Sequence, residues 1–335
     1  MIKTGGRDMR CRGFSLVELM IALTLGLVLS ALLASTYLGS RRQSQIEHEI
    51  ARLQENSRYV LHLLSRELRL AGFWGGMRDF STAVIPASAA DCGAAIDWSL
   101  DPRHSLDVIP DFNGQLMSLN GVLLSCLNGQ SIRSGSDIVA IKRAAVQATL
   151  VDGVYASGTV SADALQWYLR LAHGDHPRWH YQLGHDFPAV DVGRGSGVDY
   201  WESYASIFFV RTYSNAGDGI PTLCHERLSR DSMGPVECLV EGVEDLQIEL
   251  GLDLNGDGAA SVFRESLQPT EFDQVVAARL HLLMRSLAPL AGYRSDQYHR
   301  LGARQRGPYD DSYLRRVFTV TLTLPNVAAP RVLAP

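Results

Sequence analysis

The chain has 335 residues, 46% of them hydrophobic and 20% charged, which is the composition of a folded protein and excludes global disorder. Its net charge of −5 is unevenly distributed: residues 1–13 carry +3, which leaves −8 for the rest of the chain. An acidic body argues against nonspecific binding of DNA or RNA, because that affinity comes from neutralising phosphates with Lys and Arg.

The apolar run after this basic leader is long enough to cross a membrane. From Leu16 to Leu38 the chain has 23 residues, of which Glu18 is the only charged one, and about 20 apolar residues span a bilayer. A removable secretory signal has a shorter apolar core and a small-residue cleavage site, so it fits poorly. A plain membrane anchor leaves Glu18 unexplained, because a carboxylate costs about 2.5–3.5 kcal/mol at the bilayer centre and less near a helix end.

A third interpretation explains the glutamate. The motif RGFSLVE, residues 12–18, resembles the processing site of type IV prepilins, in which a prepilin peptidase cuts after the glycine and methylates the new N-terminal phenylalanine. The resemblance implies cleavage between Gly13 and Phe14 and makes Glu18 the fifth mature residue. We predict that Glu18 pairs with the Phe14 amine, in its own chain or, better placed, in a neighbouring subunit, because pairing offsets the burial cost of both charges.

The helical pattern continues beyond the membrane-spanning run. Residues at steps of three and four form one face of an amphipathic helix, namely Ile46, Ile50, Leu53, Ser57, Val60, Leu64 and Leu68. No proline interrupts residues 14–71, so a single helix of about 87 Å is predicted. Gly72 and the pair Gly75-Gly76 are expected to end it.

In the remaining chain, short segments rich in β-forming residues alternate with clusters of turn residues, which predicts short strands. The clearest predicted strands are Ile138–Lys142, Leu165–Arg170, Ser206–Tyr213, Val243–Leu250, Val275–Met284 and Arg316–Leu324. The last two are long and apolar and are expected to be central, whereas 87–136 and 171–200 are expected to be loop-rich insertions. A long helix packed on an antiparallel sheet is an α+β fold. The predicted divisions are a leader (1–13), a transmembrane and filament-core helix (14–38), its amphipathic continuation (39–72) and a periplasmic β-rich body (73–335).

The number of cysteines in the mature chain depends on whether the leader, residues 1–13, is removed. Cleavage after residue 13 removes Cys11 and leaves an even set: Cys92, Cys126, Cys224 and Cys238. Four cysteines allow three pairings, one of which joins nearest neighbours across 34 and 14 positions. Such disulfides persist in an oxidising compartment, whereas four free thiols would suit the cytosol. The membrane segment favours disulfides.

The sharpest candidate metal site is the run DLNGDG at 253–258. Asp253, Asn255 and Asp257 place oxygen ligands at alternating positions before a glycine, as in the calcium loop of an EF-hand. The twelfth position is Arg264 rather than glutamate, and Glu265 is one place late. The alternative is a hairpin turn, for which Asn-Gly and Asp-Gly are preferred. No other cofactor is predicted.

Three phrases resemble the PilW family of minor pilins: residues 51–75, 240–247 and 314–318. The resemblance implies a pilin-like fold and a low-abundance subunit that joins a complex priming pilus assembly at the filament tip. It would thereby support twitching motility and adhesion. The implied partners are prepilin peptidase, other minor pilins, the major pilin, a large tip adhesin and the inner-membrane assembly platform. The implied location is the inner membrane with a periplasmic body, then the extracellular pilus.

Two alternatives remain open at the level of sequence. A pseudopilin of type II secretion shares the processing site and the helix, and a tip subunit could mainly bind DNA or a host surface. The sequence contains no nucleophile elbow, phosphate loop or paired zinc motif, so an enzyme is not predicted.

Overall fold

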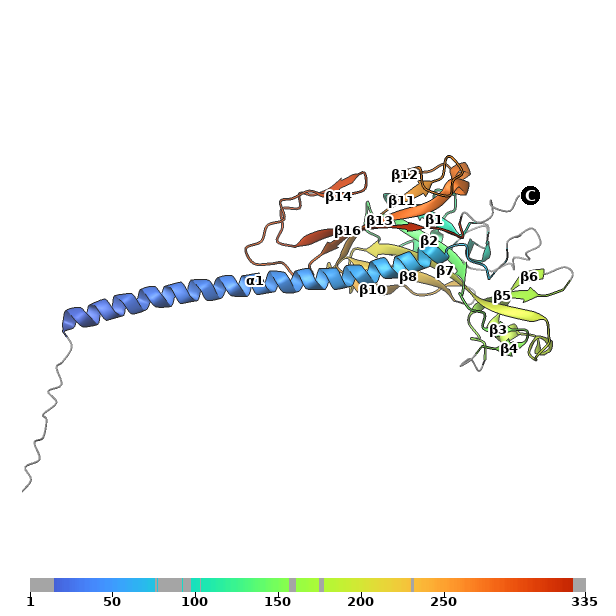
Figure 1. Ribbon diagram of the computed structural model, residues 1–335, viewed down its shortest axis with the longest axis horizontal. Coiled ribbons are helices and arrows are strands. Elements are labelled where there is room, and N and C mark those ends of the chain that lie inside the picture. Colours follow the sequence, from blue (N-terminus) through green and yellow to red (C-terminus); the bar gives the residue numbers. More distant parts are fainter. Residues whose placement is uncertain are drawn as a thin grey trace, which may run out of the picture. The chain divides into compact units, whose positions relative to one another are not determined.

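The computed structural model describes residues 15–75, 77, 92, 98–102, 104–156, 161–174, 178–229 and 232–327. The chain divides into two compact units, Met1–Ile50 and Ala51–Pro335. The long helix α1, Leu16–Leu70, runs without a break through Gly26 and Gly39 (Figure 1). The prediction of one continuous helix is confirmed for the described residues.

Gly72 ends α1 through its backbone conformation. Its φ of +79° is in the left-handed region, where glycine carries no steric penalty. Its N–H donates to the carbonyl oxygen of Lys142 at 3.0 Å, and a Cβ at this position would lie 2.9 Å from the carbonyl oxygen of Asn326. The chain can therefore turn here, against the sheet, only with glycine.

The C-terminal part of α1, from residue 51 on, packs on the β-rich body. Its buried face follows the predicted stripe and consists of Leu53, Ser57, Val60, Leu64 and Leu68, joined by Glu67. The apolar members belong to the larger of the body's hydrophobic cores, together with residues from both main sheets. The three-and-four spacing thus predicted five of the six buried residues, whereas Ile46 and Ile50, also predicted for this face, are only half-buried.

The larger sheet has ten strands arranged around the long strand β7. These strands are β1 (Leu106–Ile109), β2 (Ile138–Ala144), β3 (Leu150–Val151), β4 (Val154–Tyr155), β5 (Trp167–Ala172), β6 (Arg178–Leu183), β7 (Val198–Arg211), β8 (Thr222–Ser229), β9 (Ser232–Met233) and β10 (Glu237–Glu241). The first half of β7 pairs with β3 and β5, and its second half lies between β2 and β8, all antiparallel.

Both faces of this sheet are buried near its centre. In β2, Val139 and Ile141 belong to the core that contains α1, whereas Ile138 and Ala140 belong to a second core on the opposite face. The strand therefore reads as an uninterrupted apolar run rather than as an alternation. The expectation that 171–200 is loop-rich was wrong in part, since β6 and the start of β7 lie there.

The smaller sheet has four antiparallel strands in the order β12 (Val262–Arg264), β11 (Val243–Leu252), β13 (Val275–Arg285) and β16 (Arg315–Thr323). A separate hairpin pairs β14 (His299–Leu301) with β15 (Arg304–Arg306). The expectation that β13 is central is confirmed, but β16 pairs only with β13 and lies at the sheet edge. Its apolar character reflects contact with the core on one face, not a neighbour on each side.

Short 3-10 turns connect several of these elements. They are η1 (Trp98–Leu100), η2 (Ser125–Leu127), η3 (Gly184–Asp186), η4 (Ala189–Asp191) and η5 (Pro269–Gln274). The body is therefore a helix packed on antiparallel sheets, which confirms the α+β prediction.

Candidate functional site

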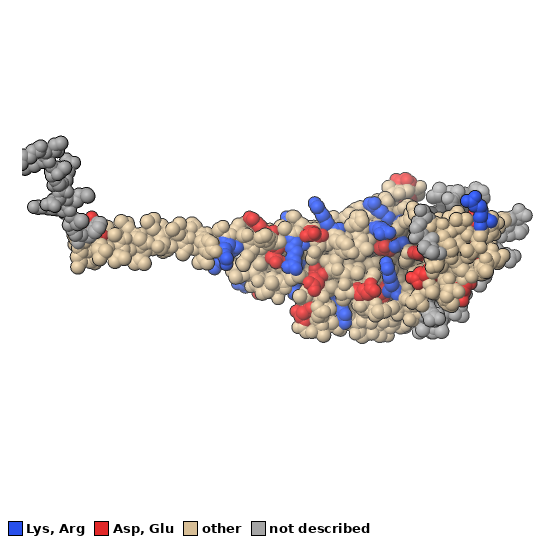
Figure 2. Space-filling model, turned by 90° about the horizontal axis from the view of Figure 1, so that it is seen from below, with Lys and Arg blue, Asp and Glu red and all other residues tan. Residues whose placement is uncertain are grey.

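The first candidate site is the exposed apolar half of α1. Within the described residues, α1 is the one helix long and apolar enough to cross a membrane by length and composition. Its large apolar side chains are open to solvent, with Leu16 75% and Leu33 70% exposed. Figure 2 shows this stretch as an almost uncharged surface. So much exposed apolar area requires a lipid or protein environment.

Glu18 is the exception in this stretch. The hydroxyls of Thr24 and Ser35 donate to carbonyl oxygens one turn back, at 2.9 and 2.8 Å, so the helix itself satisfies them. No described residue pairs with the Glu18 carboxylate. Gly13 and Phe14, which the sequence places at the cleavage site, lie outside the described residues.

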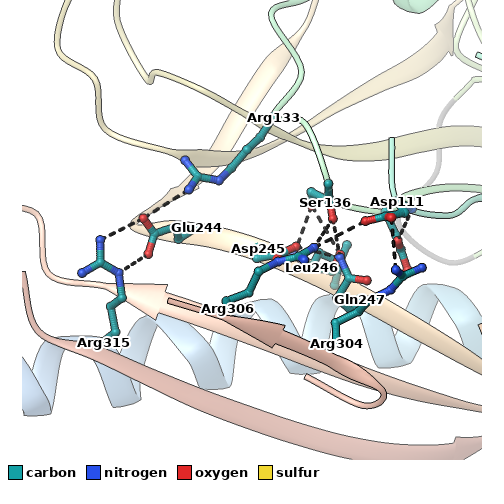
Figure 3. Close-up of polar contacts among 12 residues, drawn as sticks. Asp111, Arg133, Ser136, Glu244, Asp245, Leu246, Gln247, Arg304, Arg306 and Arg315 are labelled. Atoms are coloured by element: carbon teal, nitrogen blue, oxygen red, sulfur yellow. Dashed lines mark hydrogen bonds and ion pairs between the residues drawn. The ribbon is translucent and has the colours of Figure 1, made fainter. Parts of the chain in front are cut away.

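The second candidate site is a polar network around the start of β11, drawn in Figure 3. Glu244 is buried and accepts hydrogen bonds from Arg315 of β16 and, at 3.3 Å, from Arg133. Arg315 also forms an ion pair with Asp311 at 2.6 Å and holds the pKa of that carboxyl below its usual range. These contacts join three segments that lie far apart in the sequence.

The adjoining residues of β11 extend the network. Arg306 of β15 donates to Asp245 at 2.6 Å, and the Gln247 side chain donates to the carbonyl oxygen of Gly135 at 2.7 Å. Burial raises the pKa of Asp245 despite its cationic partner. Arg306 also donates to the Gly135 carbonyl, at 2.6 Å, so the β14–β15 hairpin is fastened to the body here.

Asp137 closes the free edge of β11. Its N–H donates to the carbonyl oxygen of Leu246 at 2.8 Å, and its two carboxylate oxygens accept the N–H groups of Asp111 and Ile248, both at 2.7 Å. Burial raises the pKa of Asp137 to about 7. In this network the charged groups pair with one another, so the arrangement braces the two sheets.

The four cysteines that follow the predicted cleavage site form two disulfides. Cys92 is joined to Cys126, and Cys224 of β8 is joined to Cys238 of β10. Of the three pairings that the sequence allowed, the structure has the nearest-neighbour set. The second bond links β8 and β10 at two residues that already face each other in the sheet.

In the turn at 253–258, backbone N–H groups of the turn itself donate to the carboxylate of Asp253. Asp253 accepts the N–H groups of Gly256 at 2.6 Å and Gly258 at 2.8 Å, which holds its pKa below the usual range. The Asn255 side chain donates to Asp257 at 3.0 Å. Glu265, the nearest candidate for a closing ligand, forms an ion pair with Arg304 at 2.9 Å instead.

These contacts favour the turn interpretation. The described part of the chain holds no cluster of three or more His, Cys, Asp or Glu residues suited to a metal ion. Calcium binding by Asp253, Asn255 and Asp257 stays a prediction, for which calorimetry of wild type and Asp257→Ala with calcium is the test.

Two family models match parts of the chain. Residues 207–326 match the family model described as type IV pilus-assembly protein W, or PilW, and residues 8–34 match the prokaryotic N-terminal methylation motif. Over residues 207–326 the chain is therefore similar to the PilW family. Among curated protein sequences, none matches it significantly.

One solved structure resembles this chain. It is a type IV-like pilin from Thermus thermophilus, 13% identical, with 83% of this chain and 99% of that chain covered and a TM-score of 0.36. A likeness at this score does not bear on the assignment.

The two matched regions coincide with the two candidate sites. The methylation motif contains Gly13, Phe14 and Glu18, and the PilW region contains β11 and most of the polar network. Sequence reasoning singled out residues 240–247 as typical of PilW proteins but did not find their partners, Arg133 and Asp137 among them. No local signal could have done so, because those partners lie more than a hundred positions away in the sequence.

Proposed function

We propose that this protein is a minor pilin of the PilW family whose apolar N-terminal helix is held first in the inner membrane and then in the filament core. Prepilin peptidase removes residues 1–13 and methylates Phe14. The body, in the periplasm, joins other minor pilins in a complex that primes assembly and remains at the pilus tip, where a large adhesin and the major pilin are its neighbours. The proposed role is structural rather than enzymatic.

A single observation carries this proposal: an isolated carboxylate, Glu18, in an otherwise uncharged apolar stretch of α1. Cleavage after Gly13 would create a positive amine on Phe14, four residues away. In an apolar surrounding each charge is costly alone, and pairing offsets much of that cost. Pairing with the amine of an adjacent subunit would make burial favourable only after docking, so the charge would set the register of assembly.

The substitution Glu18→Val tests this role. We expect the variant to be cleaved, methylated and inserted normally, because the recognition glycine and phenylalanine remain, but to enter filaments poorly. Ser15→Val, which changes a neighbouring polar residue without removing a charge, is the matched control and should enter normally. Mass spectrometry of the mature N-terminus measures processing, and immunoblotting of sheared pili measures incorporation.

Two outcomes would reject the proposal. An intact precursor that persists in cells containing active prepilin peptidase would exclude a pilin, and normal incorporation of Glu18→Val would exclude the ion-pair register. A deletion strain that keeps its pili but loses protein secretion would identify a type II pseudopilin instead.

A further inference from the structure

The outer edge of β16 has the geometry of an unoccupied strand-pairing site. The N–H of Leu324 donates to the carbonyl oxygen of Val276, and the N–H of Ser286 donates to that of Leu314, both at 2.8 Å. Because bonded and non-bonded pairs alternate in an antiparallel ladder, the even-numbered residues of β16 bond to β13. The N–H and C=O groups of Thr319 and Thr321 therefore point away from the sheet.

No described residue pairs with this edge. The four-stranded sheet ends at β16, and Thr319, Thr321 and Thr323 are exposed. The strand is nine residues long and its pairing with β13 has no bulge. Natural sheets usually block such an edge with a bulge, a proline or a covering element, because exposed backbone groups recruit another strand.

A groove of about 550 Å³ runs beside the edge, between β16 and α1. Val320 of β16, Leu61 of α1 and Val146, which is 55% exposed, contribute its apolar surface. The polar residues that line the groove include Arg66 and Arg69, and none of its lining residues is acidic. A strand added to β16 would direct every second side chain toward this groove.

We propose that β16 and this groove bind an extended segment of another pilus subunit by strand addition, and that the segment carries apolar and acidic side chains on one face. The unpaired backbone would supply hydrogen bonds, the apolar wall would take the apolar side chains, and Arg66 and Arg69 would attract the carboxylates. A second copy of this chain is disfavoured as the partner, because its β16 would bring further arginines, rather than carboxylates, next to Arg66 and Arg69. This inference rests on the proposed function only in taking the partner to be a pilus subunit.

The test uses the full chain in detergent and a labelled peptide. In this peptide threonine occupies every second position, and valine and glutamate alternate at the positions between. We expect saturable binding by fluorescence anisotropy, and no binding of a peptide with lysine in place of glutamate. Thr321→Pro removes one outward N–H at an edge position where proline is tolerated. It should weaken binding about tenfold, the equivalent of 1.4 kcal/mol.

Matched variants separate strand addition from loss of fold. Thr321→Val loses the hydrogen bond that Thr321 Oγ1 accepts from Arg279 but keeps the N–H, so it should bind as wild type. Arg66→Glu should weaken binding, whereas Arg58→Glu, an exposed residue of the same helix outside the groove lining, should not.

Three results would overturn the inference. They are absence of peptide binding, equal binding by Thr321→Pro and Thr321→Val, or slow hydrogen exchange of the outward amides in the isolated chain, which would mean that the chain covers its own edge. None of them would affect the cleavage and Glu18 results, so failure here is distinguishable from failure of the proposed function.

Discussion

At the scale of single residues, Asp137 couples the stability of the body to pH. The residue is 1% exposed, and burial raises the pKa of its carboxyl from 3.8 to about 7, despite two N–H donors. The folded state therefore holds a proton that the unfolded state releases between pH 4 and 7. Stability is fully present below the unfolded pKa and is lost as the pH rises through the folded pKa.

We predict that wild type loses stability relative to Asp137→Asn as the pH rises from 4 to 7, by a total on the order of 4 kcal/mol at 1.36 kcal/mol per pKa unit. Thermal unfolding of both proteins across this range measures the difference. The comparison is necessary because burial also raises the pKa of Glu226 to about 7. Asp218→Asn is a control that should show almost no change across this range, since backbone N–H groups, first that of Ile220, hold the pKa of Asp218 below its usual range and its contribution is lost only at lower pH. A constant difference between wild type and Asp137→Asn would contradict the assignment.

At the scale of elements, one buried ion pair fixes α1 to β2. Arg143 donates to Glu67 through Nε at 2.7 Å and Nη2 at 2.8 Å, and both side chains are less than a tenth exposed. We predict that Glu67→Ala lowers the free energy of unfolding by about 3–5 kcal/mol, because it leaves the guanidinium buried without its partner. The double variant Glu67→Met/Arg143→Met removes both charges and should recover most of the loss in denaturant unfolding. A single variant as stable as wild type would show that the pair is not buried in solution.

The disulfides give a second prediction at this scale. Non-reducing peptide mapping of the mature protein should find Cys92 linked to Cys126, Cys224 linked to Cys238, and no free thiol. Replacing Cys224 and Cys238 together by serine should cost about 3 kcal/mol, the value for a loop of about 15 residues. Any other pairing in the map would contradict the structure.

The elements also show which parts of the fold are predictable. The helix and its buried stripe could be predicted because three-and-four spacing is a local property of the chain. The strand β8 was missed because His225 and Glu226 interrupt its apolar pattern, although both are buried by neighbouring strands. The edge position of β16 could not be predicted, since the sequence of a strand does not determine how many other strands pair with it.

At the scale of the whole molecule, the two candidate sites differ in how far they could be predicted. The processing motif around Glu18 is contiguous in sequence, so it could be recognised without a structure. The polar network depends on the register of β11 against the segment 135–137 and the β14–β15 hairpin, which only the folded chain brings together. Within this network Glu244 and Asp245 are both buried.

The last prediction concerns the boundary between the two units. The helix contributes to the core of the body from Leu53 onward, so a chain of residues 51–335 should fold as a monomer in solution. Circular dichroism and gel filtration should show a cooperative, soluble protein.

A chain that begins at Ser65 lacks Leu53, Val60 and Leu64, each worth about 2–5 kcal/mol by analogy with truncation to alanine. Because domains have only about 5–15 kcal/mol of total stability, the shorter chain should unfold or aggregate. Aggregation of 51–335 would mean that the core also needs residues from the first unit, and a stable chain from 65 would mean that the stripe adds little to the fold.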